Sequence, residues 1–377
     1  MKLILSGGHP SPALAVIDTL QEKYPDVELV FVGRLVAQHT TGQLAGEASA
    51  VRERNIPFYS IETGKWGSGL WQKFITIWLV LQATWKSIWL LKRLQPDAFL
   101  SFGSYVAVPI ALACKLLRIP VVTHEQTRVA GISNRVIARW ANVVAISYPE
   151  SKSFFPQQKT ILTGLPLRPQ LFSEPSDVPA EFANPLFLHS EKPILYISGG
   201  STGSAVLNET IDSLLPELLE SWRVIHSCGK ATSVHNWKQI LLQKRATFPE
   251  KLQALYIIKE QVSVADLAWM YRQKIILIGR AGANTTAEAE AFSIPSIFIP
   301  LPLSNYDEQT KNARALEESG LAVIINQDQF NKDSLSHTLQ QLQSRLKHTA
   351  PRTVVIETAT EKLIAVVFDT CTPRHDS

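Results

Sequence analysis

Short, almost wholly apolar runs alternate along the chain with stretches whose apolar residues recur at helical spacing. In the first half, the runs cover residues 2–5, 27–32, 98–102, 120–123, 143–146 and 161–163. In the second half, they cover residues 193–198, 224–226, 254–258, 274–278 and 297–299. Strands that are apolar on both faces are typical of parallel sheets with helices on each side. The pattern predicts two α/β domains, each Rossmann-like, whose strand ends face a common cleft.

The two series of strands are separated by a stretch with little periodicity. Residues 172–191 are rich in Pro, Ser and acidic residues, which is typical of a linker. We therefore predict a boundary at Arg168, with residues 1–168 in the first domain and residues 169–355 in the second. The last helical stretch is predicted to cross back, so residues 356–377 are assigned to the first domain.

A glycine turn follows the first strand of each predicted domain. The first turn contains Ser6, Gly7, Gly8 and His9, and the second spans residues 199–204 and includes Ser201. The first turn lacks the GxGxxG spacing of dinucleotide-binding proteins, so a dinucleotide cofactor is not predicted. Backbone amides in such turns bind phosphate groups at helix N-termini. The alternative is that the glycines only allow a helix to pack closely on a strand.

Two polar segments follow strands of the second domain, at the ends where open α/β sheets collect their ligands. The first, GRAGANTTAE, spans residues 279–288. Asn284 or Thr285 can cap the helix that follows, and Thr285 with Glu288 has the spacing of a capping box. The second segment contains Asn305, Asp307, Gln309 and Asn312, which suit a polyol such as a sugar.

Polar residues also gather at strand ends of the first domain. His9 is a candidate general base, because imidazole titrates near neutral pH, and a helix-capping role is the alternative. His124, Glu125, Gln126 and Thr127 directly follow the apolar run at residues 120–123. A structural sheet does not need polar side chains there, so these residues are candidates for a ligand site. The alternative is a solvated loop.

The composition excludes some classes of protein. The hydrophobic fraction of 45% and the charged fraction of 19% are ordinary for a globular protein, and the net charge of +4 is too small to indicate nucleic-acid binding. The three cysteines are scattered without metal-ligand spacing, which indicates a reducing compartment. The first ten residues have too short an apolar run for a signal peptide, so we expect none.

Residues 63–96 contain no acidic residue, several basic ones and five tryptophans. The tryptophans are Trp66, Trp71, Trp78, Trp85 and Trp89, and the last four share one helical face. The apolar run is too broken for a membrane span of about 20 residues. A basic helix rich in tryptophan, with Lys86 beside it, suits the headgroup zone of an anionic membrane. The alternative is that the tryptophans pack on the sheet.

Several stretches resemble one family when they are taken together. They are SGGHPSPALA, SFGSYVAVPIALA, HEQTRVAGISNR, LTGLPLRP, ISGGSTGSAVLNE, GRAGANTTAEAEA and IPLPLSNYDEQTKNARALEESG, in this order. The chain resembles the MurG family of bacterial peptidoglycan N-acetylglucosaminyltransferases, in glycosyltransferase family 28. The resemblance implies a GT-B fold and inverting transfer of N-acetylglucosamine (GlcNAc) from UDP-GlcNAc to undecaprenyl-diphospho-muramoyl-pentapeptide. It also implies a peripheral location at the cytoplasmic face of the cell membrane.

The resemblance also implies roles for individual residues. His9 matches the candidate base, and Glu125 is a second candidate. Glu288 is expected to hold the ribose hydroxyls of UDP-GlcNAc, Gln309 the hydroxyls of its sugar, and the backbone of Val264 its uracil. The other expected substrate contacts are Ser6, Gly7, Gly8, Thr127, Arg168, Ser201, Ala283, Asn284, Thr285, Thr286, Asp307 and Asn312.

The chain departs from the family pattern mainly on the acceptor side. Thr127 stands where the family has Asn, and Ser101 and Ser104 stand where it has glycines. A hydroxyl cannot make the same two-way hydrogen bonds as an amide. Two alternatives therefore stay open: a related transferase with another lipid-linked acceptor, and a non-catalytic sugar-nucleotide-binding membrane protein.

No Asp-x-Asp sequence occurs anywhere in the chain, which argues against a diphosphate held by a metal ion. We therefore expect no metal and no cofactor. A helix N-terminus, loop amides and Arg168 would then meet the charge of the donor diphosphate.

Overall fold

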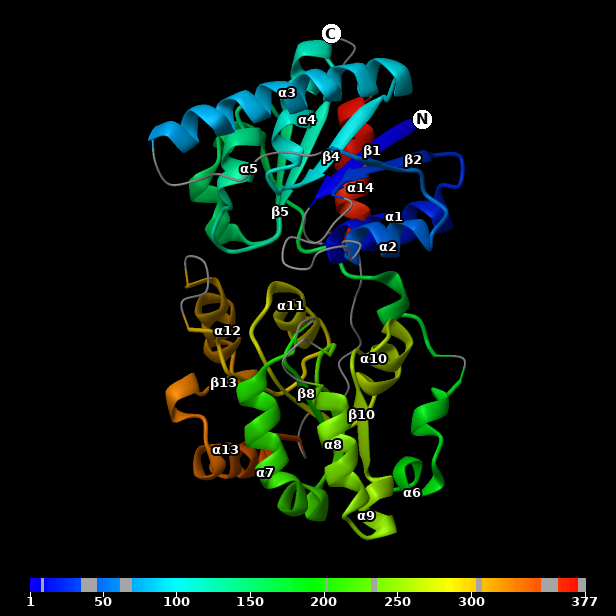
Figure 1. Cartoon of the computed structure of the whole chain (residues 1–377), viewed down its shortest axis with the longest axis vertical. Coiled ribbons are helices and arrows are strands. Elements are labelled where there is room, and N and C mark those ends of the chain that lie inside the picture. Colours follow the sequence, from blue (N-terminus) through cyan, green and yellow to red (C-terminus); the bar gives the residue numbers. More distant parts are fainter. Residues whose placement is uncertain are drawn as a thin grey trace. The chain divides into compact units, whose positions relative to one another are not determined.

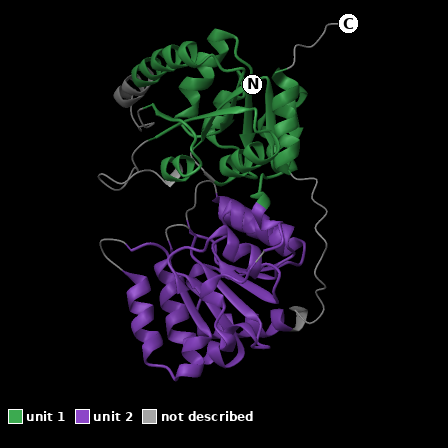
Figure 2. Cartoon of the chain, turned by 90° about the vertical axis from the view of Figure 1, so that its right-hand side faces the viewer, with its two compact units in different colours: residues 1–169, 356–377 green, residues 170–355 purple. Residues whose placement is uncertain are grey.

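The computed structural model describes residues 1–7, 10–34, 46–61, 70–175, 177–200, 203–231, 236–302, 307–346 and 359–371. The chain divides into two compact units, coloured separately in Figure 2. The first unit is Met1–Pro169 with Ile356–Ser377, and the second is Gln170–Val355. This division falls one residue beyond the predicted boundary. The C-terminal helix α14 (Ala359–Cys371) belongs to the first unit, as predicted.

The first unit is built on a seven-stranded sheet in the order β3-β2-β1-β4-β5-β6-β7, in which every neighbouring pair is parallel. Its strands are β1 (Lys2–Gly7), β2 (Glu28–Gly33), β3 (Phe58–Ser60), β4 (Ala98–Phe102), β5 (Val121–Glu125), β6 (Val143–Ile146) and β7 (Thr160–Leu162). Strand β3 is not predicted by the pattern of apolar runs, because it has only three residues and none of them is buried. The chain moves outward in one direction from β1 and then in the other from β4.

Helices cover both faces of this sheet (Figure 1). They are α1 (Pro10–Lys23), α2 (Gly46–Arg52), α3 (Leu70–Leu94), α4 (Ala107–Leu117), α5 (Ile132–Ile137) and α14. Successive residues of a strand point to opposite faces. Leu3 and Leu5 accordingly pack into one core with α1 and α14, whereas Ile4 packs into the other with α3 and α4. Burial on both faces explains why β1 is apolar throughout.

The second unit repeats this plan with a six-stranded parallel sheet in the order β10-β9-β8-β11-β12-β13. Its strands are β8 (Ile194–Ser198), β9 (Arg223–Ser227), β10 (Tyr256–Lys259), β11 (Ile275–Gly279), β12 (Ser296–Phe298) and β13 (Ala322–Ile324). Its helices are α6 (Pro185–Leu188), α7 (Ala205–Ser221), α8 (Trp237–Ala246), α9 (Glu250–Ala254), α10 (Val264–Met270), α11 (Ala283–Ala291), α12 (Glu308–Glu318) and α13 (Lys332–Leu346). The order reverses between β8 and β11.

The predicted linker is wrong, because residues 172–191 pack into the second unit. Phe182 and Phe187 are fully buried and join the core that contains Tyr196 and Trp269. Helix α6 lies in this segment, and the side chain of Asn184 caps it by accepting a hydrogen bond from Leu186 N. The linker was predicted because Pro, Ser and acidic residues dominate the composition of this segment, although it also contains the two buried phenylalanines.

A buried polar network joins α7 to β9 in the second unit. His226 is fully buried, with Nε2 at 2.9 Å from Asn208 Oδ1 and Nδ1 at 3.0 Å from the Tyr256 hydroxyl. Asn208 Nδ2 also donates to the carbonyl oxygen of Cys228 at 2.9 Å. Burial lowers the pKa of His226 to about 3, because a charged imidazole is poorly solvated there. His226 is therefore neutral in the folded protein at physiological pH.

The second unit should lose stability in mild acid because of His226. The pKa is about 3 in the folded state and about 6.5 in the unfolded chain, so the unfolded chain takes up the proton first as pH falls below 6.5. We expect this residue to lower the free energy of unfolding by about 2 kcal/mol between pH 7 and pH 5. Urea unfolding at both pH values measures the loss.

Between pH 7 and pH 5, the His226→Gln variant should lose less free energy of unfolding than the wild type does. The control His337→Gln, a change at an exposed histidine of α13, should lose as much as the wild type. An equal pH dependence in wild type and His226→Gln would contradict the assignment.

Candidate functional site

The predicted glycine turns lie where the order of each sheet reverses, which is where ligands bind to doubly wound sheets. In the first unit, Gly7 is paired in register with Phe102 of β4. A side chain on Gly7 would put its Cβ only 2.7 Å from Phe102 Cβ, so this position requires glycine. Gly8 and His9 lie outside the described residues, so their predicted roles stay predictions.

Ser6 was predicted to lie in the turn, but it lies within β1. Its side chain is fully buried, and β1 continues to Gly7. The prediction ended the strand at residue 5 because a serine and glycines follow. A contact between the Ser6 side chain and a substrate is therefore not supported.

Strand β5 also extends further than predicted, through His124 and Glu125. Both residues are almost fully buried. His124 Nε2 lies 3.2 Å from the carbonyl oxygen of Gly164 and 3.2 Å from Ser147 Oγ. Burial lowers the pKa of His124 to about 4, although the Gly164 hydrogen bond opposes the shift. His124 is thus a neutral residue of the strand rather than a residue of a solvated loop.

Glu125 closes the loop that follows β5. Its Oε1 accepts hydrogen bonds from Thr127 N at 3.0 Å and Thr127 Oγ1 at 2.8 Å. Its Oε2 accepts from Gly131 N and from Asn134 Nδ2, both at 2.9 Å. These four donors come from three positions along the loop and α5. The arrangement favours a structural role for Glu125 over that of a second base.

The Thr127 side chain is turned toward Glu125 and is largely buried. Its hydroxyl lies 2.8 Å from Glu125 Oε1 and 2.6 Å from the carbonyl oxygen of Val129, so its single proton is shared between protein acceptors. The predicted contact between Thr127 and a substrate would require this hydroxyl to leave both acceptors.

The loop after β4 carries backbone strain. Gly103 and Ser104 both have positive φ, of 76° and 78°. A side chain at position 103 would put its Cβ at 3.0 Å from Asn134 Nδ2, so glycine is needed there. Ser104 adopts a conformation that favours glycine, and such residues often lie at functional sites.

In the second unit, the turn after β8 is closely packed. A Cβ at Gly199 would lie 2.4 Å from Ser204 N, and a Cβ at Gly203, where φ is 76°, would lie 2.3 Å from the carbonyl oxygen of Cys228. Helix α7 starts immediately afterwards, capped by Ser204, whose Oγ accepts a hydrogen bond from Leu207 N. The turn therefore places the N-terminus of α7, a helix of 17 residues, at the ends of β8 and β11. Ser201 lies outside the described residues.

Arg280, which is not among the predicted site residues, connects the segments around this turn. It is 8% exposed and directly follows β11. One terminal nitrogen donates to the carbonyl oxygens of Ile299 and Pro300 at 2.9 and 3.3 Å. The other donates to Ser204 Oγ at 2.9 Å and to Gln327 Oε1 at 2.6 Å. A buried guanidinium thus fixes the N-cap of α7 relative to β12.

Helix α11 begins at Ala283, so the predicted capping is wrong. Gly282 is the N-cap, and Asn284 and Thr285 lie half-buried within the first turn. Glu288 is too far along the helix for a capping box. Its Oε2 instead accepts a 2.6 Å hydrogen bond from the Tyr271 hydroxyl.

Thr286, the next residue of the first turn, is buried. Its hydroxyl lies 3.1 Å from the carbonyl oxygens of Gly282 and Ala283, with which it can form hydrogen bonds. Its backbone N–H also donates to the carbonyl oxygen of Gly282 at 3.0 Å, so the predicted contact of Thr286 with a substrate is not supported.

The polar residues of the predicted sugar site have different environments. Asn312 is 1% exposed and donates to the carbonyl oxygen of Ala281 at 3.2 Å, so it joins α12 to the turn before α11 and does not offer a sugar contact at the surface. Gln309 Oε1 accepts a hydrogen bond from Leu301 N at 2.9 Å. Asp307 is exposed and precedes α12 with a positive φ of 57°. Asn305 lies outside the described residues.

Two further predicted contacts are half-buried. Val264 opens α10, where Ser263 and Asp266 form a capping box. Asp266 also pairs with Lys259 at 2.6 Å, which fixes this helix start to the end of β10. Arg168 lies near the end of the first unit's main segment.

Helix α3 exposes an apolar face. The side chains of Trp78, Trp85 and Trp89 are 61%, 63% and 64% exposed, respectively, which rules out the alternative that these three pack on the sheet. Thr84 and Ser87 lie on the buried side and bond to backbone carbonyls of their own helix. Figure 1 shows α3 lying over α4.

The basic residues Lys86, Lys92 and Arg93 are exposed on the same helix. Trp71 lies in α3, but its side chain, like the whole of Trp66, lies outside the described residues. Within the part of the chain that the structure describes, no helix has the length and apolarity to cross a membrane.

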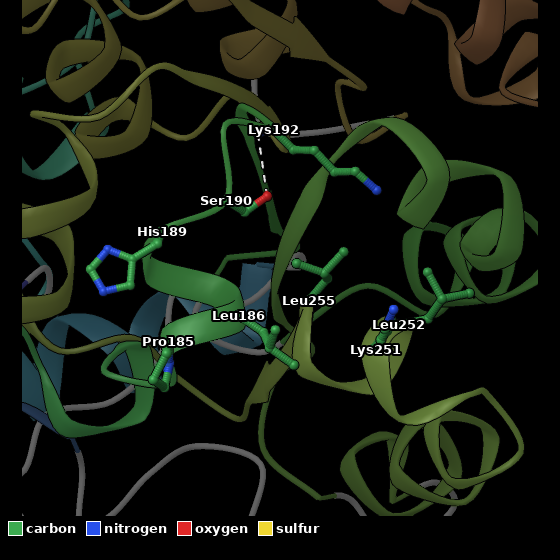
Figure 3. Close-up of a pocket in the computed structure, with 8 residues that line it drawn as sticks. All are labelled: Pro185, Leu186, His189, Ser190, Lys192, Lys251, Leu252 and Leu255. Atoms are coloured by element: carbon green, nitrogen blue, oxygen red, sulfur yellow. Dashed lines mark hydrogen bonds between the residues drawn. The ribbon is translucent and has the colours of Figure 1, made fainter.

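The second unit also has a pocket (Figure 3). It is lined by Pro185, Leu186, His189, Ser190, Lys192, Lys251, Leu252 and Leu255. Its walls come from α6 and the residues between α6 and β8, and from α9 and Leu255, which precedes β10. It contains none of the predicted site residues.

Comparisons with known proteins agree with this geometry. Residues 6–146 match the model of the glycosyltransferase family 28 N-terminal domain, and residues 194–366 match that of the C-terminal domain. Curated relatives include the UDP-N-acetylglucosamine--N-acetylmuramyl-(pentapeptide) pyrophosphoryl-undecaprenol N-acetylglucosamine transferase of Lachnospira eligens, which is 30% identical over 90% of both chains. The Listeria monocytogenes enzyme of the same name is 31% identical over 91% of this chain and 90% of its own.

Solved structures confirm the predicted fold. Acinetobacter baumannii MurG superposes with a TM-score of 0.66 and 26% identity, and the match covers 98% of this chain and 99% of that one. A UDP-GlcNAc 2-epimerase from Neisseria meningitidis, solved with UDP-GlcNAc bound, has a TM-score of 0.64 over 98% of this chain and 100% of its own. The epimerase is only 13% identical, so it shows a shared fold and nothing more.

The stability of the loop after β5 should depend on the Glu125 carboxylate. Glu125→Gln replaces a carboxylate that accepts four hydrogen bonds by an amide whose nitrogen cannot accept any. We expect the free energy of unfolding to fall by about 2 kcal/mol. Amide hydrogen exchange should become faster in residues 126–131. A variant of unchanged stability and exchange that has lost turnover would show instead that Glu125 acts in the chemistry.

Proposed function

Because the chain belongs to glycosyltransferase family 28 and, within it, to the MurG family, we propose that it transfers GlcNAc from UDP-GlcNAc to undecaprenyl-diphospho-muramoyl-pentapeptide in peptidoglycan synthesis. The chain is a glycosyltransferase. One observation carries the proposal: relatives named for this reaction match both units, over about nine-tenths of the chain. Both the donor half and the acceptor half of the reaction therefore have counterparts here.

The donor is proposed to bind at the ends of β8 and β11. Two helix N-termini, those of α7 and α11, start from turns at neighbouring strands there. Free amides and the positive end of a helix attract a diphosphate. Arg280 adds a buried positive charge between them. Together with the lack of an Asp-x-Asp sequence, this arrangement supports transfer without a metal ion or another cofactor.

The reaction is proposed to be a direct displacement that inverts the sugar. The acceptor hydroxyl oxygen attacks the anomeric carbon as the bond from that carbon to the UDP oxygen breaks. His9 takes the hydroxyl proton, and UDP leaves with its charge held by the helix N-termini. His9 has the residue type and the place in the chain for this role, after β1 at the reversal point of the first sheet.

A second acceptor remains a candidate because of Thr127. Its hydroxyl is directed to Glu125 and to a backbone carbonyl, whereas an amide could contact these groups and a ligand at once. A related polyprenyl-linked glycan would then be the acceptor. Mass spectrometry of the products formed from a mixture of lipid-linked acceptors distinguishes the two.

A membrane-surface partner is proposed for α3. Three exposed tryptophans and exposed basic residues on one helix suit the headgroup zone of an anionic bilayer, where indole rings concentrate and cations are attracted. A lipid-linked acceptor lies in that bilayer, so the protein is proposed to act as a peripheral protein at the cytoplasmic face. This location would bring its first unit to the acceptor.

Transfer from radiolabelled UDP-GlcNAc to undecaprenyl-diphospho-muramoyl-pentapeptide in detergent, with EDTA present, tests the reaction. We expect lipid-linked product in EDTA. His9→Ala should lower turnover about 10²- to 10⁴-fold, and His189→Ala, a change at an exposed histidine of the second unit, should leave it unchanged. Absence of product while UDP-GlcNAc still binds would move the proposal to the second acceptor. Unchanged turnover of His9→Ala would remove His9 from the mechanism.

Liposome flotation tests the membrane proposal. Replacement of Trp78, Trp85 and Trp89 by Ser should abolish flotation with anionic liposomes at low salt, because the apolar anchor is removed. The matched control replaces Ile240 and Leu242, exposed apolar residues of α8, and should float like the wild type. Failure of the wild type to bind, or equal flotation of the tryptophan variant, would contradict the proposal.

A further inference from the structure

A buried phenol and a carboxylate are joined beside the proposed donor site. Tyr271 is the C-cap of α10, and its hydroxyl donates a 2.6 Å hydrogen bond to Oε2 of Glu288 in α11. Bonds of this length are typical when the acceptor is ionised. The bond therefore links two helices, both of which follow strands of the second sheet and carry residues of the proposed donor site.

The surroundings of Tyr271 keep its side chain in one place. It is 7% exposed, and its ring packs on Phe292 with a centroid distance of 5.0 Å. Phe292 in turn stacks on Phe172 at 5.1 Å. Burial and the charge of Glu288 raise the pKa of Tyr271 well above its ordinary value. The phenol therefore stays protonated, and the direction of the bond is fixed, with Tyr271 as the donor.

Glu288 does not cap its own helix. It is the sixth residue of α11, and Gly282 is the N-cap. A glutamate on a half-exposed helical position ordinarily samples several rotamers. Here the carboxylate is tied to a rigid partner. A carboxylate has about four lone-pair positions, so one whose orientation is fixed can accept hydrogen bonds from both hydroxyls of a diol.

We propose that Tyr271 is a positioning residue that orients the Glu288 carboxylate toward the ribose hydroxyls of the donor nucleotide. This inference rests on the proposed function, in which Glu288 binds those hydroxyls. The substrate class is a uridine diphosphate with an intact ribose. Removing the phenol would leave the carboxylate in place but disordered, so it would weaken binding only where the ribose hydroxyls contribute.

Titration calorimetry with UDP and with 2′,3′-dideoxy-UDP tests the inference. Tyr271→Phe keeps the ring and removes only the hydroxyl. We expect it to weaken UDP binding about tenfold, the effect of one hydrogen bond to a charged group. The Tyr271→Phe variant should bind 2′,3′-dideoxy-UDP as tightly as the wild type does. The double variant Tyr271→Phe/Glu288→Gln should bind UDP no more weakly than Glu288→Gln alone.

The matched control is Tyr256→Phe, which removes another buried phenol of the same unit, one that contacts His226 instead. It should leave the affinities for both nucleotides unchanged. Thermal unfolding of each variant verifies the fold. In the transfer assay, Tyr271→Phe should raise KM for UDP-GlcNAc more than it lowers kcat, as expected when binding is weakened equally in ground and transition states.

The outcomes separate this inference from the proposed function. If Glu288→Gln binds UDP as tightly as the wild type, the ribose role of Glu288 fails, and the inference fails with it. If Glu288→Gln loses affinity for UDP alone while Tyr271→Phe does not, only the inference is overturned. Equal weakening of both nucleotides by Tyr271→Phe would also overturn it, because the effect would not depend on ribose hydroxyls.

Discussion

The reversal of strand order within each sheet is the constraint on which the rest of the structure depends. Between β8 and β11, and between β1 and β4, the crossover helices on the two sides leave in opposite directions. The strand ends at these positions are therefore open to ligands. Closely packed glycines lie at both positions: Gly7 of β1 lies against Phe102 of β4, and Gly279 of β11 against Ser198 of β8, where no side chain fits. Strand burial, turn sequence and helix N-termini are consequences of the same arrangement.

The two α/β units and their glycine turns could be predicted from the sequence, because buried parallel strands are apolar on both faces and glycine turns are conspicuous. What could not be predicted depends on contacts between distant residues. Glu288 has the spacing of a capping box, but helix α11 starts at Ala283, and the tyrosine that binds the carboxylate lies 17 residues earlier in the chain. Arg280 contacts Ser204 and Gln327, far away on either side of it in the sequence.

The polar residues of the first unit show the same limitation. Glu125 looks like a candidate base in a sequence, because polarity at a strand end is typical of both ligand sites and loop closures. Only the four hydrogen bonds that it accepts favour a structural role. The exposed tryptophans of α3 were predictable as one helical face, because their spacing alone determines it. That this face points outward depends on Thr84 and Ser87 packing inward.

The central claim is that the donor nucleotide binds at the reversal point of the second sheet. Amide hydrogen exchange with and without UDP-GlcNAc measures this most directly. The account predicts slower exchange of the amides in residues 279–288 when the nucleotide is added, because these amides and the start of α11 would be covered. Residues 126–131 in the first unit should exchange as before. Unchanged exchange in residues 279–288, with slowing confined to residues 126–131, would contradict the account.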